Sequence, residues 1–125
     1  MRFNASHRFA RISPRKVRHL ANLIRGKFAD DALNLLKYQP QRGARMLEKV
    51  IKSALGNAMD PDQAKGETVD PDALMVIDCR IDGGPTFKRI RPRARGMAFS
   101  IKRRMAHIKV TLADVISEVG EQDSE

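Results

Sequence analysis

The sequence predicts an α+β fold: three helices pack on a small three-stranded antiparallel sheet, and a long β-hairpin arm projects from that sheet. Three observations favour this class. Apolar residues alternate with period two in three segments, which is typical of half-buried strands. Three other segments repeat apolar residues with helical spacing. A basic stretch separates the last two strands, and it is too long to lie on a domain of this size.

The chain has 125 residues, of which 42% are hydrophobic and 31% are charged. This composition fits one domain with an aliphatic core, and we expect it to occupy residues 1–125, with the arm at about residues 83–105. The longest apolar run, Ala73 to Ile77, is far too short to span a bilayer, so no membrane partner is expected. No apolar signal core follows Met1, and the single Cys79 cannot form an internal disulfide. A reducing, cytoplasmic location is therefore predicted.

The first element is predicted to be a strand that runs towards Arg11. Phe3, Ala5, His7 and Phe9 alternate with polar residues, so one face of this strand should be buried.

Three helices are predicted next. Ser13 is placed to cap the first, Pro14 suits its first position, and Gly26 ends it. Asp30 is predicted to cap a second helix that runs through Tyr38, because Pro40 prevents continuation. The third helix should span about Gln41 to Met59. The residues expected on the inward faces are Val17, Leu20, Ala21 and Ile24, then Ala32, Leu35 and Leu36, then Ala44, Leu47, Ile51, Ala54, Leu55 and Ala58.

The second and third strands enclose the basic stretch. The second is predicted to bury Met75, Ile77, Cys79 and Ile81, with Cys79 as a small hydrophobe rather than a nucleophile. The third is predicted to bury Ala106, Ile108, Val110 and Leu112. Pro92 and Gly96 lie near the middle of the stretch, which favours one antiparallel hairpin. Each limb would reach roughly 35 Å at about 3.3 Å per residue.

Two acidic segments are predicted to be solvated. One is the connector from Asp60 to Asp72, whose two Asp-Pro-Asp triplets lack the spacing of a calcium loop. The other is the tail from Glu118 to Glu125. No metal site and no cofactor are expected from these or any other residues.

Charge is segregated along the chain, and this points to a polyanionic partner. All 15 acidic residues lie in Asp30 to Asp82 or Asp114 to Glu125. The two acid-free stretches, Met1 to Ala29 and Gly83 to Ala113, hold 17 of the 24 basic residues, and the net charge is +9. Two separate basic surfaces that bind nucleic acid are the hypothesis this favours.

The arm is the first of these surfaces. Four arginines recur with period two, so we expect them on one edge with apolar residues on the other. Because like charges repel, such an arm should become ordered when phosphates bind its guanidinium groups. The residues assigned to this surface are Lys88, Arg89, Arg91, Arg93, Arg95, Lys102, Arg103 and Arg104, with Ile90, Pro92 and Ala94 on the apolar edge.

The second surface surrounds the start of the first helix, where backbone amides can also accept a phosphate. A solvated charge run is the plain alternative for part of it. Its members are Arg8, Arg11, Arg15, Lys16, Arg18, Arg25 and Lys27.

No catalytic residues are predicted. The chain has no glycine-rich phosphate loop and no Cys/His metal spacing, and its three histidines fall in different elements. A small RNA-processing enzyme is therefore a distant alternative.

Several blocks resemble the universal large-subunit ribosomal protein L-twenty-two family, bacterial type, in the same order. Ser13-Pro14-Arg15-Lys16-Val17-Arg18 and Leu23-Ile24-Arg25-Gly26-Lys27 resemble its start. The block from Gly84 to Gly96 resembles its arm, and Lys102-Arg103, His107-Ile108 and Val110 resemble its closing strand. Together these blocks cover most of Phe3 to Leu112.

The resemblance implies a scaffold of the large ribosomal subunit, located in the cytoplasm within the ribosome. It implies that body and arm bind large-subunit (23S) rRNA and support assembly. It also implies that the arm lines the nascent-polypeptide exit tunnel, with Lys88 to Arg95 as the tip. The implied partners are 23S rRNA, neighbouring ribosomal proteins near the tunnel and the nascent polypeptide, without a homo-oligomer.

A DNA-bending architectural protein is the leading alternative, because some of these proteins also use β-arms with a proline near the tip. Such proteins generally dimerise, and this sequence shows no evident dimer seam.

Overall fold

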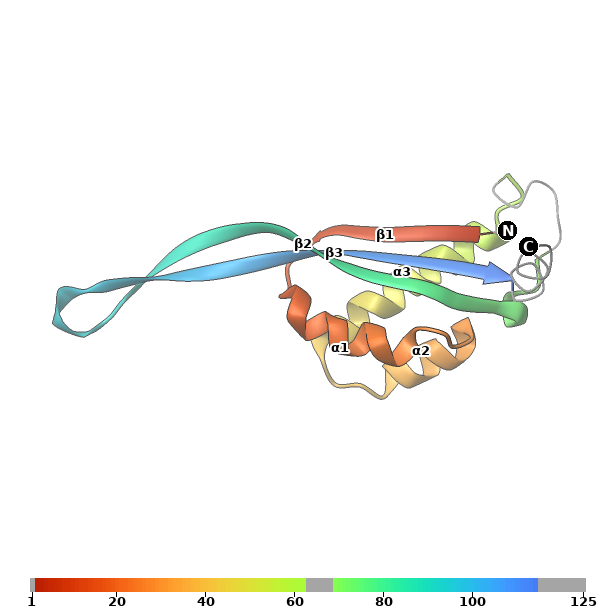
Figure 1. The fold of residues 1–125 in the computed structure, drawn as a ribbon, viewed down its shortest axis with the longest axis horizontal. Helices are drawn as coiled ribbons and strands as arrows, with labels where there is room; N and C mark the ends of the chain where they lie inside the picture. Colours follow the sequence, from red (N-terminus) through yellow and green to blue (C-terminus); the bar gives the residue numbers. More distant parts are fainter. Residues whose placement is uncertain (1, 63–68, 115–125) are drawn as a thin grey trace, which may run out of the picture.

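The structure, a computed structural model, describes residues 2–62 and 69–114. A body of helices and strands lies at one end, and a two-stranded arm extends far beyond it (Figure 1). The predicted α+β class with a projecting hairpin is confirmed. In chain order the elements are β1 (Arg2–Ala10), α1 (Pro14–Ile24), α2 (Ala29–Lys37), α3 (Arg42–Met59), η1 (Pro71–Ala73), β2 (Leu74–Pro92), η2 (Ala94–Gly96) and β3 (Ala98–Asp114).

The sheet is antiparallel with the order β1-β3-β2, so the last strand is central. Strand β3 buries Ala106, Ile108, Val110 and Leu112, as predicted. The helices lie on one side of the sheet (Figure 1), and the core residues lie between these two layers. The opposite face carries polar side chains such as Asn4, whose side-chain oxygen accepts a hydrogen bond from Thr111 Oγ1 at 2.8 Å. A sheet with one buried face explains the period-two pattern.

The prediction for β1 is only partly right. Phe3 is buried and Ala5 is half-buried, but His7 and Phe9 are exposed. The pairing with β3 shifts between His7 and Ala10, and Phe9 takes a φ of 60°. This irregularity returns Ala10 to the core. One extra residue reverses the faces that follow it, so strict alternation assigned the wrong side to Phe9.

The predicted inward face of β2 is wrong in its first half for the same reason. Leu74 and Val76 are buried, whereas Met75 and Ile77 are only half-buried. The pairing with β3 shifts between Val76 and Asp78. After this bulge, Cys79 and Ile81 face the core as predicted.

The observed helices agree closely with those predicted from the sequence. Val17, Leu20, Ala21 and Ile24 of α1 are buried, and Gly26 follows that helix with a φ of 84°. Ser13 occupies the predicted N-cap position, although its side chain donates and accepts no capping hydrogen bond. The N-cap of α2 is Phe28, not Asp30, which lies in the first turn beside Asp31. Leu35 and Leu55 are half-buried against the core, and the other predicted inward residues of α2 and α3 are buried.

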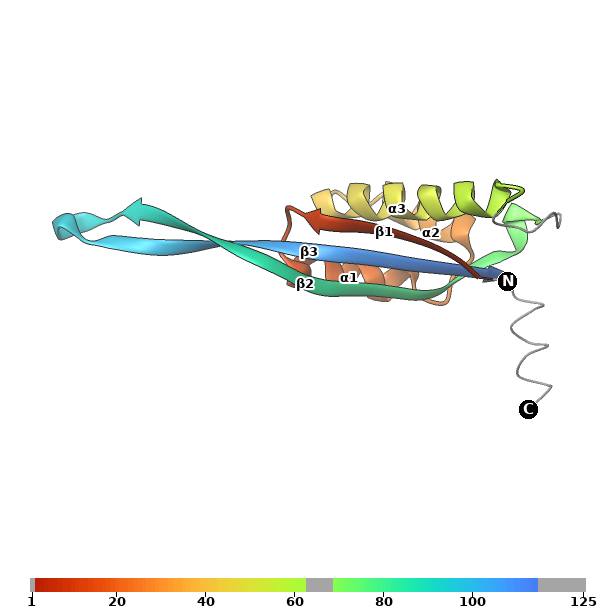
Figure 2. The same ribbon diagram turned by 90° about the horizontal axis from the view of Figure 1, so that it is seen from above.

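The arm begins where β1 ends. Beyond Ala10, strands β2 and β3 continue as a two-stranded ribbon with a second pairing shift between Gly83 and Thr86. The ribbon twists strongly as it leaves the body (Figure 2). Its strands close between Arg93 and Met97, where the Arg93 amide donates to the Met97 carbonyl at 2.7 Å. Arg95 and Gly96 form this turn with φ angles of 64° and 69°.

Two predicted segments lie wholly or partly outside the described residues. The connector from Asp60 to Asp72 is described except at 63–68, and Asp70 caps η1 by accepting a hydrogen bond from the Asp72 amide. The tail from Glu118 to Glu125 is not described. In the described part of the chain, no helix combines the length and apolarity needed to cross a membrane.

Candidate nucleic-acid interface

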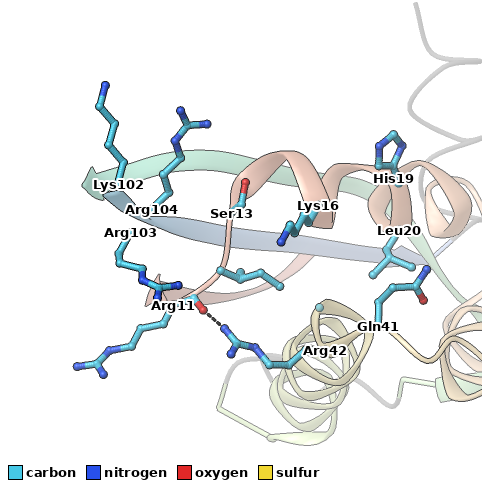
Figure 3. A pocket seen from close by; sticks show the side chains of 12 residues that line it. Arg11, Ser13, Lys16, His19, Leu20, Gln41, Arg42, Lys102, Arg103 and Arg104 are labelled. Carbon is cyan, nitrogen blue, oxygen red and sulfur yellow. Dashed lines mark hydrogen bonds between the residues drawn. The ribbon is translucent and has the colours of Figure 1, made fainter. Parts of the chain in front are cut away.

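An open cleft of about 910 Å³ lies at the root of the arm. Three segments form it: the start of α1, the start of α3 and the arm root on β3 (Figure 3). Its lining includes six basic residues, namely Arg11, Lys16, Arg42, Lys102, Arg103 and Arg104. Ile12, Ser13, His19, Leu20, Gln41 and Gly43 complete it. The cleft therefore joins the two basic surfaces that the sequence had suggested separately.

Close packing of α1 and α3 brings their N-termini to this cleft. Gly43 lies in the first turn of α3, where a Cβ would be 3.2 Å from Val17 Cγ2 and 3.3 Å from Leu20 Cδ1. A larger residue would force these side chains, and Ile12 Cδ1 at 3.3 Å, to shift. The Arg42 guanidinium donates a hydrogen bond to the Arg11 carbonyl, which ties the start of α3 to the end of β1 (Figure 3).

The electrostatics of the cleft are one-sided. Within the described residues, none of its six basic side chains forms an ion pair with a carboxylate. Neither α1 nor α3 has an acidic residue in its first turn. The positive end of each helix dipole therefore adds to the side-chain charge. An anion with several negative groups spaced along its length, such as a nucleic-acid backbone, matches this arrangement.

The register of the arm divides its side chains between two faces. Residues directly opposite one another in an antiparallel pair share a face. On one face, Phe87 pairs with Arg103, Arg89 with Ile101, and Arg91 with Phe99; we call these six residues the ladder face. On the reverse face, Thr86 pairs with Arg104, Lys88 with Lys102, Ile90 with Ser100, and Pro92 with Ala98.

This register corrects the predicted division into a guanidinium edge and an apolar edge. Arg89 and Arg91 do share a face, but two phenylalanines and Ile101 lie on it as well. Arg95 lies in the closing turn instead of on a strand. Lys88 and Lys102 face each other directly, which disfavours the ribbon until an anion lies between them.

Arg18 and Arg25 have a structural role that the sequence did not predict. Arg18 Nε and Nη2 donate to the Ile81 carbonyl at 3.3 and 3.2 Å. Arg25 donates to the Cys79 carbonyl and, at 2.7 Å, to Asn22 Oδ1. Both carbonyls lie on β2, an edge strand of the sheet, so the two arginines cover part of that edge. Their remaining N–H groups are still able to meet a phosphate.

The other predicted basic residues lie on exposed surface. The Arg8 guanidinium lies 5.2 Å from the centre of the Phe9 ring. Arg15 is exposed on α1, and Lys27 is exposed just after that helix. On the arm, Arg93 and Arg95 lie at the closing turn, while Lys88 to Pro92 belong to the strand behind it. The apex thus also includes Gly96 and Met97, which the predicted tip omitted.

Arg42, His19 and Gln41 are polar lining residues of the cleft that the sequence did not assign to a binding surface. Arg42 and Gln41 fall in the acid-containing middle of the chain, and charge segregation gave no reason to select them. The signal that could have identified Arg42 is its place at a predicted helix start, just after Pro40. Arg45 was also missed, and it instead joins α3 to the end of α2 by donating to the Leu36 carbonyl at 2.8 Å.

Cys79 is fully buried, which confirms its predicted place in the core. Burial raises the pKa of its thiol from 9.0 to about 11, so the thiol is neutral at pH 7. Over residues 2–62 and 69–114, no three His, Cys, Asp or Glu side chains gather in a way that would hold a metal ion.

Comparison with known proteins decides the family. The family model described as "Ribosomal protein L22p/L17e" matches residues 5–113, which include both strands of the arm and the whole cleft. The chain belongs to this ribosomal protein family. It is therefore a structural constituent of the large ribosomal subunit and not an enzyme.

Curated members of the family are similar to the chain over nearly their full length. The large ribosomal subunit protein uL22 of Rhodopirellula baltica is 65% identical over 113 residues, which is 90% of this chain and 95% of that protein. The uL22 proteins of Maridesulfovibrio salexigens and Caldicellulosiruptor saccharolyticus are each 47% identical, over 92% and 88% of this chain and 100% and 86% of their own lengths.

Proposed function

We propose that the cleft and the arm bind large-subunit (23S) rRNA and thereby support assembly of the subunit. The observation that carries this proposal is the cleft at the arm root, where six basic residues gather without a carboxylate partner in the described chain. The basic residues of the arm extend this surface away from the body. Membership of a ribosomal family makes rRNA the polyanion that such a surface would meet.

The proposal covers every basic residue predicted from the sequence, with two grades of involvement. Residues of the cleft and the arm, together with the exposed Arg8, Arg15 and Lys27 of the body, would contact phosphates directly. Arg18 and Arg25 would do so only with the donors that β2 leaves available. Arg42 joins the set because it lines the cleft.

Salt dependence of binding tests this function. If about eight phosphates are neutralised, log K for a large-subunit rRNA fragment should fall with log salt at a slope of roughly −6 to −7. The double variant Lys16→Gln, Lys102→Gln removes two cations from the cleft, so the slope should become shallower by about 1.5.

The matched control is Lys49→Gln, Lys52→Gln, which removes the same charge from exposed positions further along α3. This control should keep nearly the full slope. Equal losses in the two double variants would show that net charge, not the cleft, determines binding. A slope near zero in the unaltered protein would refute the proposed function altogether.

The finer part of the proposal is that the arm apex lines the nascent-polypeptide exit tunnel, beside neighbouring ribosomal proteins. The length of the ribbon supports it, since the closing turn lies far from the body (Figure 1). Exposed residues occupy the turn itself, including Met97 with 58% of its surface accessible.

A photo-crosslinking residue at position 97 tests this placement in assembled ribosomes that carry a stalled nascent chain. The crosslinker should capture the nascent polypeptide. The control replaces Tyr38, which is 84% exposed on the body, and should capture none. If ribosomes that contain the position-97 variant yield no nascent-chain product, the tunnel placement is wrong.

A further inference from the structure

The ladder face of the arm has an unusual composition. Each of its three successive rungs pairs one cationic side chain with one apolar side chain, and two of the three apolar members are phenylalanines. The reverse face has no aromatic residue, and its outer rungs carry no charge. A surface built only to attract phosphates would need no rings at these positions.

The two rings are not packed against each other. Phe87 lies opposite Arg103 and Phe99 lies opposite Arg91, so each ring has a cation as its direct cross-strand neighbour. Phe87 is 44% exposed and Phe99 is 51% exposed. Both lie well beyond Met105, the last buried residue of β3 towards the arm, so burial in the fold does not explain them.

One arginine side chain lies beside the Phe87 ring in a way that suits base stacking. The Arg89 guanidinium lies 5.6 Å from the centre of the Phe87 ring. Guanidinium planes and aromatic rings both stack on nucleobases, and the same guanidinium can donate to a phosphate. Phe99 pairs with Arg91, which lies four residues from Phe87 on the other strand. The two rings are therefore about 13 Å apart along the ribbon, at roughly 3.3 Å per residue. Two bases splayed out from a backbone fit this spacing.

We propose that the ladder face stacks unpaired nucleobases through Phe87 and Phe99, and that it therefore selects single-stranded RNA over regular duplex. This inference rests on the proposed rRNA-binding function and specifies the form of RNA that the arm takes. Bases inside an A-form helix are stacked on one another and offer no free face to a ring, whereas loop and bulge bases do. The reverse face has no ring and would contact RNA only through its charges near the arm root.

The chain contains no tryptophan, so a single introduced indole reports on one position. Phe99→Trp places it on the ladder face, and Ile90→Trp places it on the reverse face, where Ile90 is 77% exposed. With a short single-stranded oligoadenylate as the probe, fluorescence of the indole at position 99 should be quenched, and that at position 90 should hardly change. A duplex of oligoadenylate with oligouridylate should quench neither.

Affinity provides a second measurement that does not depend on the indole. Phe87→Leu, Phe99→Leu keeps apolar side chains but removes both rings, and it should weaken binding of the single strand roughly tenfold or more. The slope of log K against log salt should stay the same, because no cation is lost. Ile90→Leu, the control on the reverse face, should leave the affinity unchanged.

The outcomes separate this inference from the proposed function. If the double leucine variant binds the single strand as tightly as the unaltered chain, with the same salt slope, stacking is refuted while phosphate binding stands. Equal quenching of the indoles at positions 90 and 99 also refutes stacking. The same holds if an acidic peptide quenches the indole at position 99 as strongly as oligoadenylate does. If the unaltered chain shows no salt-dependent binding of RNA, the proposed function itself is refuted.

Discussion

The Arg18 guanidinium donates two hydrogen bonds to the Ile81 carbonyl, at 3.3 and 3.2 Å, although the two residues are 63 positions apart. This contact joins α1 to the edge strand β2 close to the root of the arm. A residue that looks like part of a phosphate-binding surface therefore also stabilises the sheet that carries the arm.

Arg18→Ala should lower the free energy of unfolding by about 1 to 3 kcal/mol, because the Ile81 carbonyl loses a charged donor. Urea denaturation of the free protein measures this. Arg15→Ala is the control, since Arg15 is an exposed arginine on the same helix. Its effect should stay within about 0.5 kcal/mol. Equal destabilisation by the two variants would mean that the Arg18 contact adds nothing specific.

Gly84→Ala should destabilise the arm root by about 1 to 3 kcal/mol through overpacking. A Cβ at Gly84 would lie 3.2 Å from both the Cβ and the carbonyl oxygen of Met105, and 3.3 Å from His107 Nε2. The backbone oxygen has little freedom to move away. Gly83→Ala is the adjacent control, because a Cβ there meets nothing within 4 Å. Thermal unfolding should show a lower midpoint for the first variant alone.

Cys79 should make stability fall with rising pH above about 9. Its thiol has a pKa of about 11 in the folded chain and an ordinary value of 9.0. Between these values the unfolded chain has released the proton and the folded chain has kept it, so deprotonation favours unfolding. Urea denaturation from pH 8 to pH 11 should show a steeper loss for the unaltered chain than for Cys79→Ala. Parallel curves would contradict the buried, neutral thiol.

Deletion of Phe87 to Arg89 should leave the body folded, because all three residues are exposed and lie outside the core. The thermal midpoint of the free protein should stay close to that of the full chain. Removing an odd number of residues from one limb reverses the faces of the residues that follow, so Arg91 should leave the ladder face. Incorporation into large subunits should persist while the arm apex is displaced. Unfolding of the free variant would refute the independence of arm and body.

Much of the fold follows from local rules that the sequence carries. Helix α1 could be predicted because Pro14, Gly26 and four apolar residues each satisfy a short-range requirement of a helix. Strand β3 could be predicted because its inward face alternates without interruption from Ala106 to Leu112. The arm could be predicted because that apolar alternation stops inside a long acid-free stretch, which leaves the stretch without a face to bury.

The bulges in β1 and β2 were not predictable in the same way. A bulge is set by how two strands pair, and neither strand alone shows where an extra residue will be accommodated. This is why Phe9, Met75 and Ile77 were assigned to the buried face and are exposed or half-buried.

The sequence by itself determined that this chain carries segregated positive charge on an α+β body with a projecting hairpin, because charge and periodicity are properties of neighbouring residues. Only the tertiary structure decided which cations act together. Packing of Gly43 against Val17 places Arg42 in the cleft with Lys16, and strand register places Phe99 beside Arg91. Such distances depend on contacts between residues far apart in the chain, and no local pattern specifies them.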